Sequence, residues 1–151
     1  MMMALSQTIL LVEDNDDDAE LTQLAFGRAR INNPIVRAKD GLDALDYLFA
    51  RGAHATRDAN DSPAVVLLDL NLPRLSGLEV LAEIRGDQRT SRIPVVVLTS
   101  SDEEEDRLAA YDRRANSYMR KPVDHDEFID ATRSLGLYWL VLNLPPPRSV
   151  R

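Results

Sequence analysis

Acidic side chains follow two apolar runs of this 151-residue chain, at the point where each run ends. Asp69 closes the apolar run 64–68, and Glu13 and Asp14 close the apolar run 9–12. A short run that is almost entirely Val, Leu and Ile is typical of a strand buried on both faces of a parallel sheet. The three carboxylates therefore lie where such strands leave the core, which is the edge where ligands and chemistry gather in open α/β sheets.

Two further strand ends add a hydroxyl and an amine to this edge. The run 95–98 ends at Thr99, and a short fourth strand ends at Lys121. Crowded carboxylates raise one another's pKa values unless a cation neutralises them, and Mg²⁺ prefers one or two carboxylates together with water and phosphate oxygens. The Lys121 ammonium is a compact charge suited to a phosphoryl oxygen. This set of groups predicts a phosphorylatable, Mg²⁺-binding site.

The composition excludes several other classes of protein. The chain has no cysteine, which rules out disulfides, thiolate zinc sites and thiol catalysis. Its 25 acidic residues against 18 Lys and Arg give a net charge of −7, which argues against a nucleic-acid partner. No apolar run approaches the roughly 20 residues that span a bilayer, and residues 1–7 do not form a signal peptide. We therefore expect a cytoplasmic protein that has no membrane partner.

Strand and helix patterns alternate along the whole chain and predict an α/β fold, a doubly wound parallel sheet of five strands and five helices. Apolar spacing places Leu24 on the buried side of the first helix and Leu42 on that of the second. The expected strands are 8–13, 35–38, a third from residue 65, 94–98 and 117–119; the expected helices are 15–30, 42–51, 78–85, 102–113 and a last one from residue 125.

Helix starts carry capping signals that agree with these boundaries. A side chain that can cap a helix stands three residues before a Glu at three places, the pattern of a capping box. The three pairs are Ser76 with Glu79, Ser101 with Glu104, and Asp124 with Glu127; Asp40 with Asp43 is a weaker version.

Five segments, each at a strand-to-helix turn, carry a resemblance to a known family. They are Leu11-Val12-Glu13-Asp14-Asn15, Asp40-Gly41-x-x-Ala44-Leu45, Leu67-Leu68-Asp69-Leu70-Asn71-Leu72-Pro73-x-x-x-Gly77, Ile93-Pro94-Val95-Val96-Val97-Leu98-Thr99-Ser100 and Tyr118-x-x-Lys121-Pro122. From Thr8 to about Leu135 the chain resembles a response-regulator receiver domain of two-component signalling. The resemblance implies a flavodoxin-like sheet with strand order 2-1-3-4-5.

The resemblance also assigns roles to the residues of the predicted site. Asp69 matches the phosphoacceptor, which takes a phosphoryl group from a kinase histidine. Asp14 and Asp69 match residues that bind Mg²⁺ through carboxylates, Asn71 one that binds it through its backbone carbonyl, and Glu13 one that acts through water. A simpler interpretation of Asn71 is a turn residue before the following proline.

Three more residues match the family's switching machinery. Lys121 and Thr99 would hold phosphoryl oxygens, and Thr99 would let Tyr118 turn inward as it moves toward the phosphoryl group. The simpler alternatives are a strand end for Thr99, a half-buried aromatic without a switching role for Tyr118 and a surface amine for Lys121. Whether the peptide bond from Lys121 to Pro122 is cis is open at this point. Arg114 stands where many receivers carry Gly, which also leaves the local turn open.

The chain continues past the usual end of a receiver, so we divide it into a receiver domain, 1–136, and a C-terminal extension, 137–151. If the last helix runs on, one stripe at helical spacing includes Phe128, Thr132, Leu135, Trp139 and Leu142, with other apolar residues on the remaining faces.

We expect a homodimer through Tyr138, Trp139, Leu142 and the face of the fourth helix and fifth strand. The alternative is that the extension folds back over its own domain. The segment Tyr138-Trp139-Leu140 resembles a subgroup of stand-alone receivers that accompany bacterial phytochrome histidine kinases, which makes such a kinase an expected partner.

These features predict a single-domain response regulator that is phosphorylated on Asp69 and signals by altered protein contacts or onward phosphotransfer. It is not expected to be an enzyme beyond self-catalysed phosphotransfer and autodephosphorylation. An Asp-nucleophile phosphohydrolase is an alternative, but such enzymes require a second acid where this chain has Asn71. A vestigial receiver that acts as a scaffold and a flavin-binding protein are further alternatives, which the complete acidic site disfavours.

Overall fold

The fold is a five-stranded parallel sheet with the strand order β2-β1-β3-β4-β5, which confirms the predicted architecture. It is seen in a computed structural model that describes residues 8–101, 103–122, 124–144 and 146. The strands are β1 (Ile9–Val12), β2 (Ile35–Ala38), β3 (Val65–Leu68), β4 (Val95–Thr99) and β5 (Ser117–Arg120).

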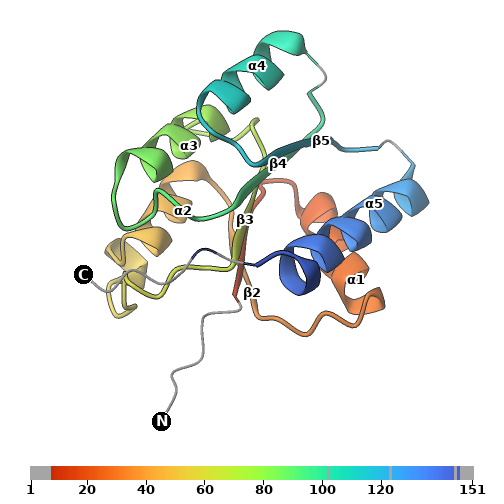
Figure 1. Ribbon diagram of the computed structural model, residues 1–151, viewed down its shortest axis with the longest axis horizontal. Helices are drawn as coiled ribbons and strands as arrows, with labels where there is room; N and C mark the ends of the chain where they lie inside the picture. The colour runs from red at the N-terminus through yellow and green to blue at the C-terminus, as the bar shows by residue number, and fades with distance from the viewer. Residues whose placement is uncertain (1–7, 102, 123, 145, 147–151) are drawn as a thin grey trace.

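Helices cover both faces of the sheet, as Figure 1 shows, with α1 and α5 on one face and α2, α3 and α4 on the other. Their bounds are α1 (Asp16–Arg28), α2 (Gly41–Leu48), α3 (Gly77–Gly86), α4 (Glu104–Asp112) and α5 (His125–Leu137), with a 3₁₀ turn η1 (Gly52–His54) and a π-helical turn η2 (Tyr138–Leu142). Among the described residues, no helix is both long and apolar enough to cross a membrane.

Successive residues of the central strands point to opposite helical layers, which explains why these strands are apolar throughout. Leu10 and Val66 belong to the core under α2, α3 and α4, whereas Leu11 and Leu67 belong to the core under α1 and α5. All of β1, β3 and β4 is buried. Polar groups can therefore emerge only at the strand ends.

The helix caps confirm one predicted capping box in full and correct another. Ser76 caps α3 and Glu79 returns the bond, as predicted. Helix α4 instead begins after Glu103 without a side-chain cap. The predicted cap, Ser101, donates its hydroxyl to Asp106 at 2.6 Å. Among the described residues, the Ser101 hydroxyl oxygen accepts only from the N–H of Glu103, at 3.4 Å, which lies before the first residue of α4.

Two side chains that were predicted to be buried are exposed. Leu24 of α1 is 45% exposed and Leu42 of α2 is 42% exposed. In α1 the buried position goes to Thr22, whose hydroxyl donates to the carbonyl oxygen of Asp18 at 2.8 Å and so needs no partner from the core. Helix α2 also ends before the predicted boundary, because Ala50 adopts a positive φ of 53° that a helix cannot continue.

Arg114 takes the backbone conformation that glycine favours, with φ at 64°. The turn closes α4 through a bond from the Ala115 N–H to the Ala110 carbonyl at 3.0 Å. Arg85 of α3 donates to the Arg114 carbonyl at 2.8 Å and to the Asn116 side chain at 2.9 Å. These bonds from a neighbouring helix offset the cost of a left-handed arginine.

The last helix does not keep the single stripe predicted for it. Trp139 and Leu140 pack against the core under α1 and α5, whereas Leu142 is 70% exposed. The cause is η2, in which the Asn143 N–H bonds to the Tyr138 carbonyl five residues back, so the helical register shifts. The predicted Pro-rich tail lies, apart from residue 146, outside the described residues.

Helices α1 and α5 approach closely at Gly136, where an added Cβ would lie 2.5 Å from a ring carbon of Phe26. We expect Gly136→Ala to lower the free energy of unfolding by about 1–3 kcal/mol, because the packed core cannot accommodate the methyl group. Gly27→Ala in α1 is the matched control. A Cβ there meets nothing within 4 Å, and the change should raise stability by about 0.5–1 kcal/mol. Urea unfolding measures both, and equal effects would contradict the packing argument.

Candidate functional site

The predicted carboxylates meet at the carboxyl edge of the sheet. Glu13 and Asp14 follow β1, and Asp69 follows β3. One carboxylate oxygen from each lies within 4.8 Å of the others. Glu13 and Asp69 are buried, whereas Asp14 is exposed. The site therefore has two buried acids and a third acid at its solvent-exposed opening.

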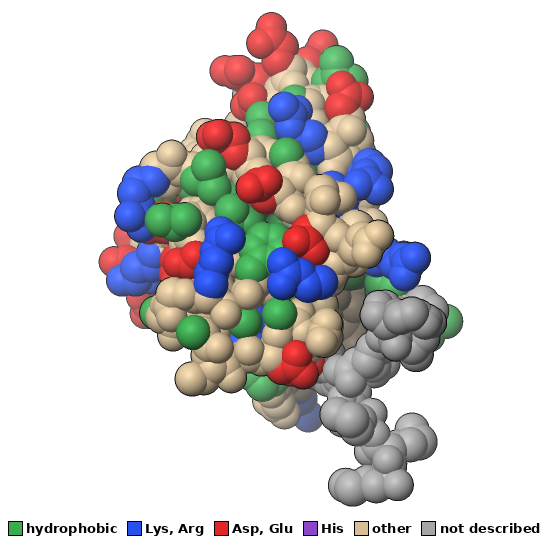
Figure 2. All heavy atoms as spheres, turned by 90° about the vertical axis from the view of Figure 1, so that its left-hand side faces the viewer, with side chains coloured by type: hydrophobic (Ala, Val, Ile, Leu, Met, Phe, Trp, Pro, Cys, Tyr) green, Lys and Arg blue, Asp and Glu red, His purple; other side chains and the backbone are tan. Residues whose placement is uncertain are grey.

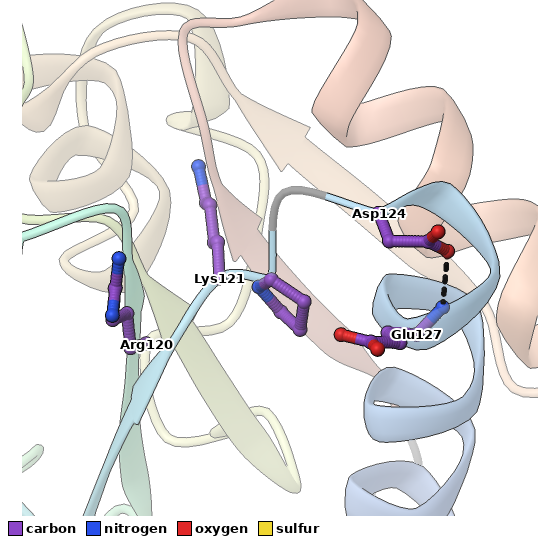
Figure 3. A pocket seen from close by; sticks show the side chains of 5 residues that line it. Arg120, Lys121, Asp124 and Glu127 are labelled. Carbon is purple, nitrogen blue, oxygen red and sulfur yellow. Dashed lines mark hydrogen bonds between the residues drawn. The ribbon is translucent and has the colours of Figure 1, made fainter.

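The Lys121 ammonium lies among these acids and is itself only 7% exposed. It donates to Glu13 Oε1 at 2.6 Å, to Asp18 Oδ2 at 2.8 Å and to Asp69 Oδ2 at 3.1 Å. Figure 3 shows the side chain pointing away from α5. The alternative of a surface amine is thus wrong.

The lysine is carried by the turn between β5 and α5. Arg120, Pro122, Asp124 and Glu127 line a shallow hollow beside it (Figure 3). Asp124 caps α5 by accepting from the Asp126 and Glu127 N–H groups. The Lys121 N–H also donates to the Thr99 carbonyl at 2.6 Å, which ties the start of this turn to the end of β4. The bond from Lys121 to Pro122 is trans, since the described residues contain no cis peptide.

Two residues of the site were missed by sequence reasoning. Asp18 is one of three consecutive acids at the start of α1, and it is the one that pairs with Lys121. The neighbouring sequence does not distinguish it from Asp16 and Asp17, since the bond from its N–H to the cap Asn15 fixes the backbone and not the direction of the side chain. Arg37 of β2 donates to the Glu13 carbonyl at 3.0 Å and pairs with Asp16.

The pKa values of both central groups are raised, which favours the neutral form of Glu13 and the charged form of Lys121. Burial raises the pKa of Glu13 to about 7; Lys121 opposes this rise and the Asp69 carboxylate adds to it. Burial alone lowers the pKa of Lys121, but the carboxylates of Asp18, Glu13 and Asp69 outweigh it and leave the pKa raised. Lys121 is therefore charged at neutral pH, while Glu13 titrates there.

The second oxygen of each buried acid is also fixed by a backbone donor. Asp69 Oδ1 accepts from the Asn71 N–H at 3.2 Å, and Glu13 Oε2 accepts from the Asn15 N–H at 3.3 Å. Gly77 makes the first turn possible, because a Cβ there would lie 2.3 Å from the Asp69 carbonyl oxygen. The glycine of the motif thus lets α3 approach the backbone of the site.

Thr99 and Tyr118 are tied to one residue of the β4–α4 turn. Thr99 is fully buried, and its hydroxyl oxygen accepts from the Ser101 N–H at 3.3 Å. The half-buried Tyr118 donates its hydroxyl to the Ser101 carbonyl at 3.1 Å. A change at Thr99 would therefore reach Tyr118 through Ser101.

The donor set fits a divalent cation. If all are ionised, the carboxylates of Glu13, Asp14, Asp18 and Asp69 outnumber the one ammonium of Lys121 by three charges. Asp14 accepts no hydrogen bond or ion pair from any residue the structure describes, so its oxygens are available. Hard oxygen donors of this kind suit Mg²⁺ or Mn²⁺.

Comparison with known proteins gives one family over most of the chain. The response regulator receiver domain matches residues 9–133. Two curated relatives are the "Probable methanogenesis regulatory protein FilR2" of Methanothrix harundinacea and the response regulator Rcp1 of Synechocystis. FilR2 is 40% identical over 91% of this chain and 86% of its own length. Rcp1 is 37% identical over 89% of each.

Solved structures of response regulators superpose on most of this chain. The phosphorylated cyanobacterial phytochrome response regulator RcpA superposes with a TM-score of 0.87 at 37% identity, over 94% of this chain and 99% of its own. The Mn²⁺-bound form of Rcp1 also gives 0.87, at 35% identity over 93% and 99%. The bacteriophytochrome response regulator RtBRR gives 0.75 at 46% identity, over 96% and 87%.

The raised pKa of Glu13 leads us to expect that cation binding depends on pH. Below about pH 7 the Glu13 carboxyl holds a proton, so the site has one negative charge less and binds a divalent cation more weakly. We expect the affinity for Mn²⁺ to rise with pH up to about 7 and then to level off. Calorimetric titration from pH 5.5 to 8.5 measures this. Glu13→Gln should remove the step, and an unchanged step in that variant would assign it to another group.

Proposed function

Because the chain belongs to the response regulator receiver domain family, we propose that a histidine kinase phosphorylates it on Asp69. Phosphorylation then changes its contacts with partner proteins, or the phosphoryl group passes onward. The observation that carries the proposal is the buried Lys121 ammonium, which bridges Glu13 and Asp69 beside the exposed Asp14.

In the transfer step, a carboxylate oxygen of Asp69 attacks the phosphorus while the bond from phosphorus to the kinase histidine nitrogen breaks. The Asn71 N–H already orients Asp69 through its other oxygen. Mg²⁺, held by Asp14, Asp69 and the Asn71 carbonyl, with Glu13 acting through water, would neutralise charge on the transferred group. Positioning and charge neutralisation then account for the reaction without a general acid or base.

The remaining residues act after transfer. Lys121 and the Thr99 hydroxyl hold oxygens of the phosphoryl group. Thr99 then releases the Ser101 N–H, which frees the turn that holds the Tyr118 hydroxyl and lets the ring turn inward. The surface of α4 and β5 is where this change reaches a partner. Water later attacks the phosphorus of the acyl phosphate as its bond to the Asp69 oxygen breaks, which releases inorganic phosphate and returns Asp69 as a carboxylate. We propose no other enzymatic activity.

The kinase that fits this chain best is a bacteriophytochrome. Two observations support this: the likeness to RcpA and RtBRR, which are phytochrome response regulators, and the segment 138–140. We retain the division into a receiver, 1–136, and an extension, 137–151. A cytoplasmic location stays a prediction. The phosphohydrolase alternative is not favoured, because the position two residues after Asp69 is an exposed Asn.

We also propose that two copies pair through the extension and the face of α4 and β5. Tyr138 and Leu142 are 50% and 70% exposed, and Leu108 and Tyr111 of α4 are 64% and 50% exposed. Trp139 is partly buried against its own domain and stacks edge-on with Tyr138 at 5.1 Å. Trp139 would therefore contribute to the interface by holding the Tyr138 ring in place. Figure 2 shows the side of the molecule with α2, α3 and α4, where acidic side chains gather at the end formed by α4.

Incubation with acetyl phosphate and Mg²⁺ tests the phosphoacceptor. We expect one acid-stable, hydroxylamine-labile phosphoryl group on the wild-type protein, seen as a single added mass. Asp69→Asn should abolish it, because the amide is not a nucleophile under these conditions. Asp130→Asn, an exposed acid on α5, is the control and should be phosphorylated like the wild type.

Three results would contradict this assignment. Full labelling of Asp69→Asn would place the phosphoryl group elsewhere. Absence of any adduct on the wild type would favour the scaffold interpretation, and continuous turnover of phosphate esters would favour the phosphohydrolase.

The dimer is tested by light scattering at micromolar concentration. We expect a mass of two chains for the wild type and of one chain for Tyr138→Ser with Leu142→Ser, since these changes remove exposed apolar area from the contact. Leu42→Ser, on the exposed surface of α2, is the control and should leave the mass at two chains. A wild-type mass of one chain would contradict the proposed dimer.

A further inference from the structure

Asp18 is a carboxylate of the site that the proposed reaction does not use. It comes from α1 rather than from a strand end, and it binds neither Asp69 nor any backbone donor of the site through its side chain. Its side chain is 29% exposed, against 3% for Glu13 and 7% for Asp69. Its one side-chain contact in the described part of the chain is the Lys121 ammonium, at 2.8 Å.

That contact completes the hydrogen bonding of Lys121. An ammonium has three N–H donors. They go to Glu13, Asp18 and Asp69, and the bond to Asp69 is the longest of the three at 3.1 Å. Without Asp18, the third donor would have only Glu13 and Asp69 as charged acceptors among the described residues. Asp18 therefore weakens the hold of Lys121 on Asp69.

Asp18 can do this because its own position is fixed. Its N–H donates to the Asn15 side chain at 2.9 Å, and its carbonyl accepts from the Thr22 hydroxyl at 2.8 Å. The carboxylate therefore projects from the rigid first turn of α1. It forms an anchor for the amine that does not depend on Asp69.

We propose that Asp18 is a positioning residue for phosphoryl transfer to Asp69, because it draws the Lys121 ammonium toward α1 and keeps it from closing over the Asp69 carboxylate. The Asp69 oxygens are then available to a divalent cation and to an incoming phosphoryl group. The inference rests on the proposed function and adds to it a residue that acts through Lys121 and touches neither the cation nor the phosphoryl group.

The test compares Asp18→Asn with Asp17→Asn, which removes the same charge from the same turn. Asp17 is exposed and contacts no side chain of the site among the described residues. We expect Asp18→Asn to raise the dissociation constant for Mg²⁺ about three- to tenfold, because the freed amine competes with the cation for Asp69. Asp17→Asn should raise it less than about twofold, through screened charge alone.

The rate of labelling by acetyl phosphate separates positioning from damage. At low Mg²⁺ the initial rate of Asp18→Asn should fall in step with its weaker cation binding. At saturating Mg²⁺ it should return to the wild-type rate, since the cation then displaces the amine. Asp18→Glu, which restores the carboxylate, should restore the affinity. A rate that stays low at saturating Mg²⁺ would overturn the inference, because it would mean a distorted site.

A double-mutant cycle with Lys121→Met shows whether Asp18 acts through the amine. In the Met background, Asp18→Asn should affect Mg²⁺ binding no more than Asp17→Asn does. An effect of Asp18→Asn in the Met background as large as its effect in the parent chain would overturn the inference. Equal effects of Asp18→Asn and Asp17→Asn in the parent chain would also overturn it. If Lys121→Met does not fold, which thermal melting reveals, the comparison of the two Asn variants decides alone.

Failure of the proposed function is distinguishable from failure of this inference. A wild-type protein that takes no phosphoryl group from acetyl phosphate contradicts the phosphoacceptor role of Asp69. The Mg²⁺ dissociation constants of the Asp18 and Asp17 variants still decide whether Asp18 positions the amine, because they require no phosphorylation.

Discussion

One buried ammonium shared by three carboxylates is the interaction on which the site depends. Lys121 follows β5 and reaches Glu13 after β1, Asp69 after β3 and Asp18 in α1. Removing such charges from water costs several kcal/mol per ion, and only full hydrogen bonding offsets that cost. If all four carboxylates of the site are ionised, an excess of negative charge remains, which a divalent cation can neutralise when a phosphoryl group binds.

The parallel sheet supplies the geometry for this interaction. Because β1, β3, β4 and β5 run in the same direction, their carboxyl ends deliver Glu13, Asp69, Thr99 and Lys121 to one edge. Close approach of backbone to backbone at Gly77, and of α2 to the Leu75 carbonyl at Gly41, keeps that edge compact. The same edge is linked to α4 and β5 through the bonds of Ser101 to Thr99, Tyr118 and Asp106.

The sequence predicted the sheet and the acids because both depend on local signals, namely apolar runs and the polar residue that ends each run. It failed where tertiary contacts decide. Asp18 lies in a run of acids whose members look alike until the fold places one of them beside the Lys121 ammonium. The exposure of Leu142 depends on a π-helical turn, and the left-handed Arg114 depends on bonds from Arg85 of another helix. None of these has a signal in the neighbouring residues.

In the proposed mechanism, the Lys121 ammonium moves from its carboxylates to the phosphoryl group. The ¹⁵N resonance of the Lys121 Nζ, recorded with Mg²⁺ alone and after addition of beryllium fluoride as a phosphoryl mimic, tests it most directly. We expect a sharp, slowly exchanging signal that shifts when the mimic binds Asp69, because the mimic replaces one carboxylate partner of the ammonium. An unchanged Lys121 signal in protein that has bound the mimic would contradict it.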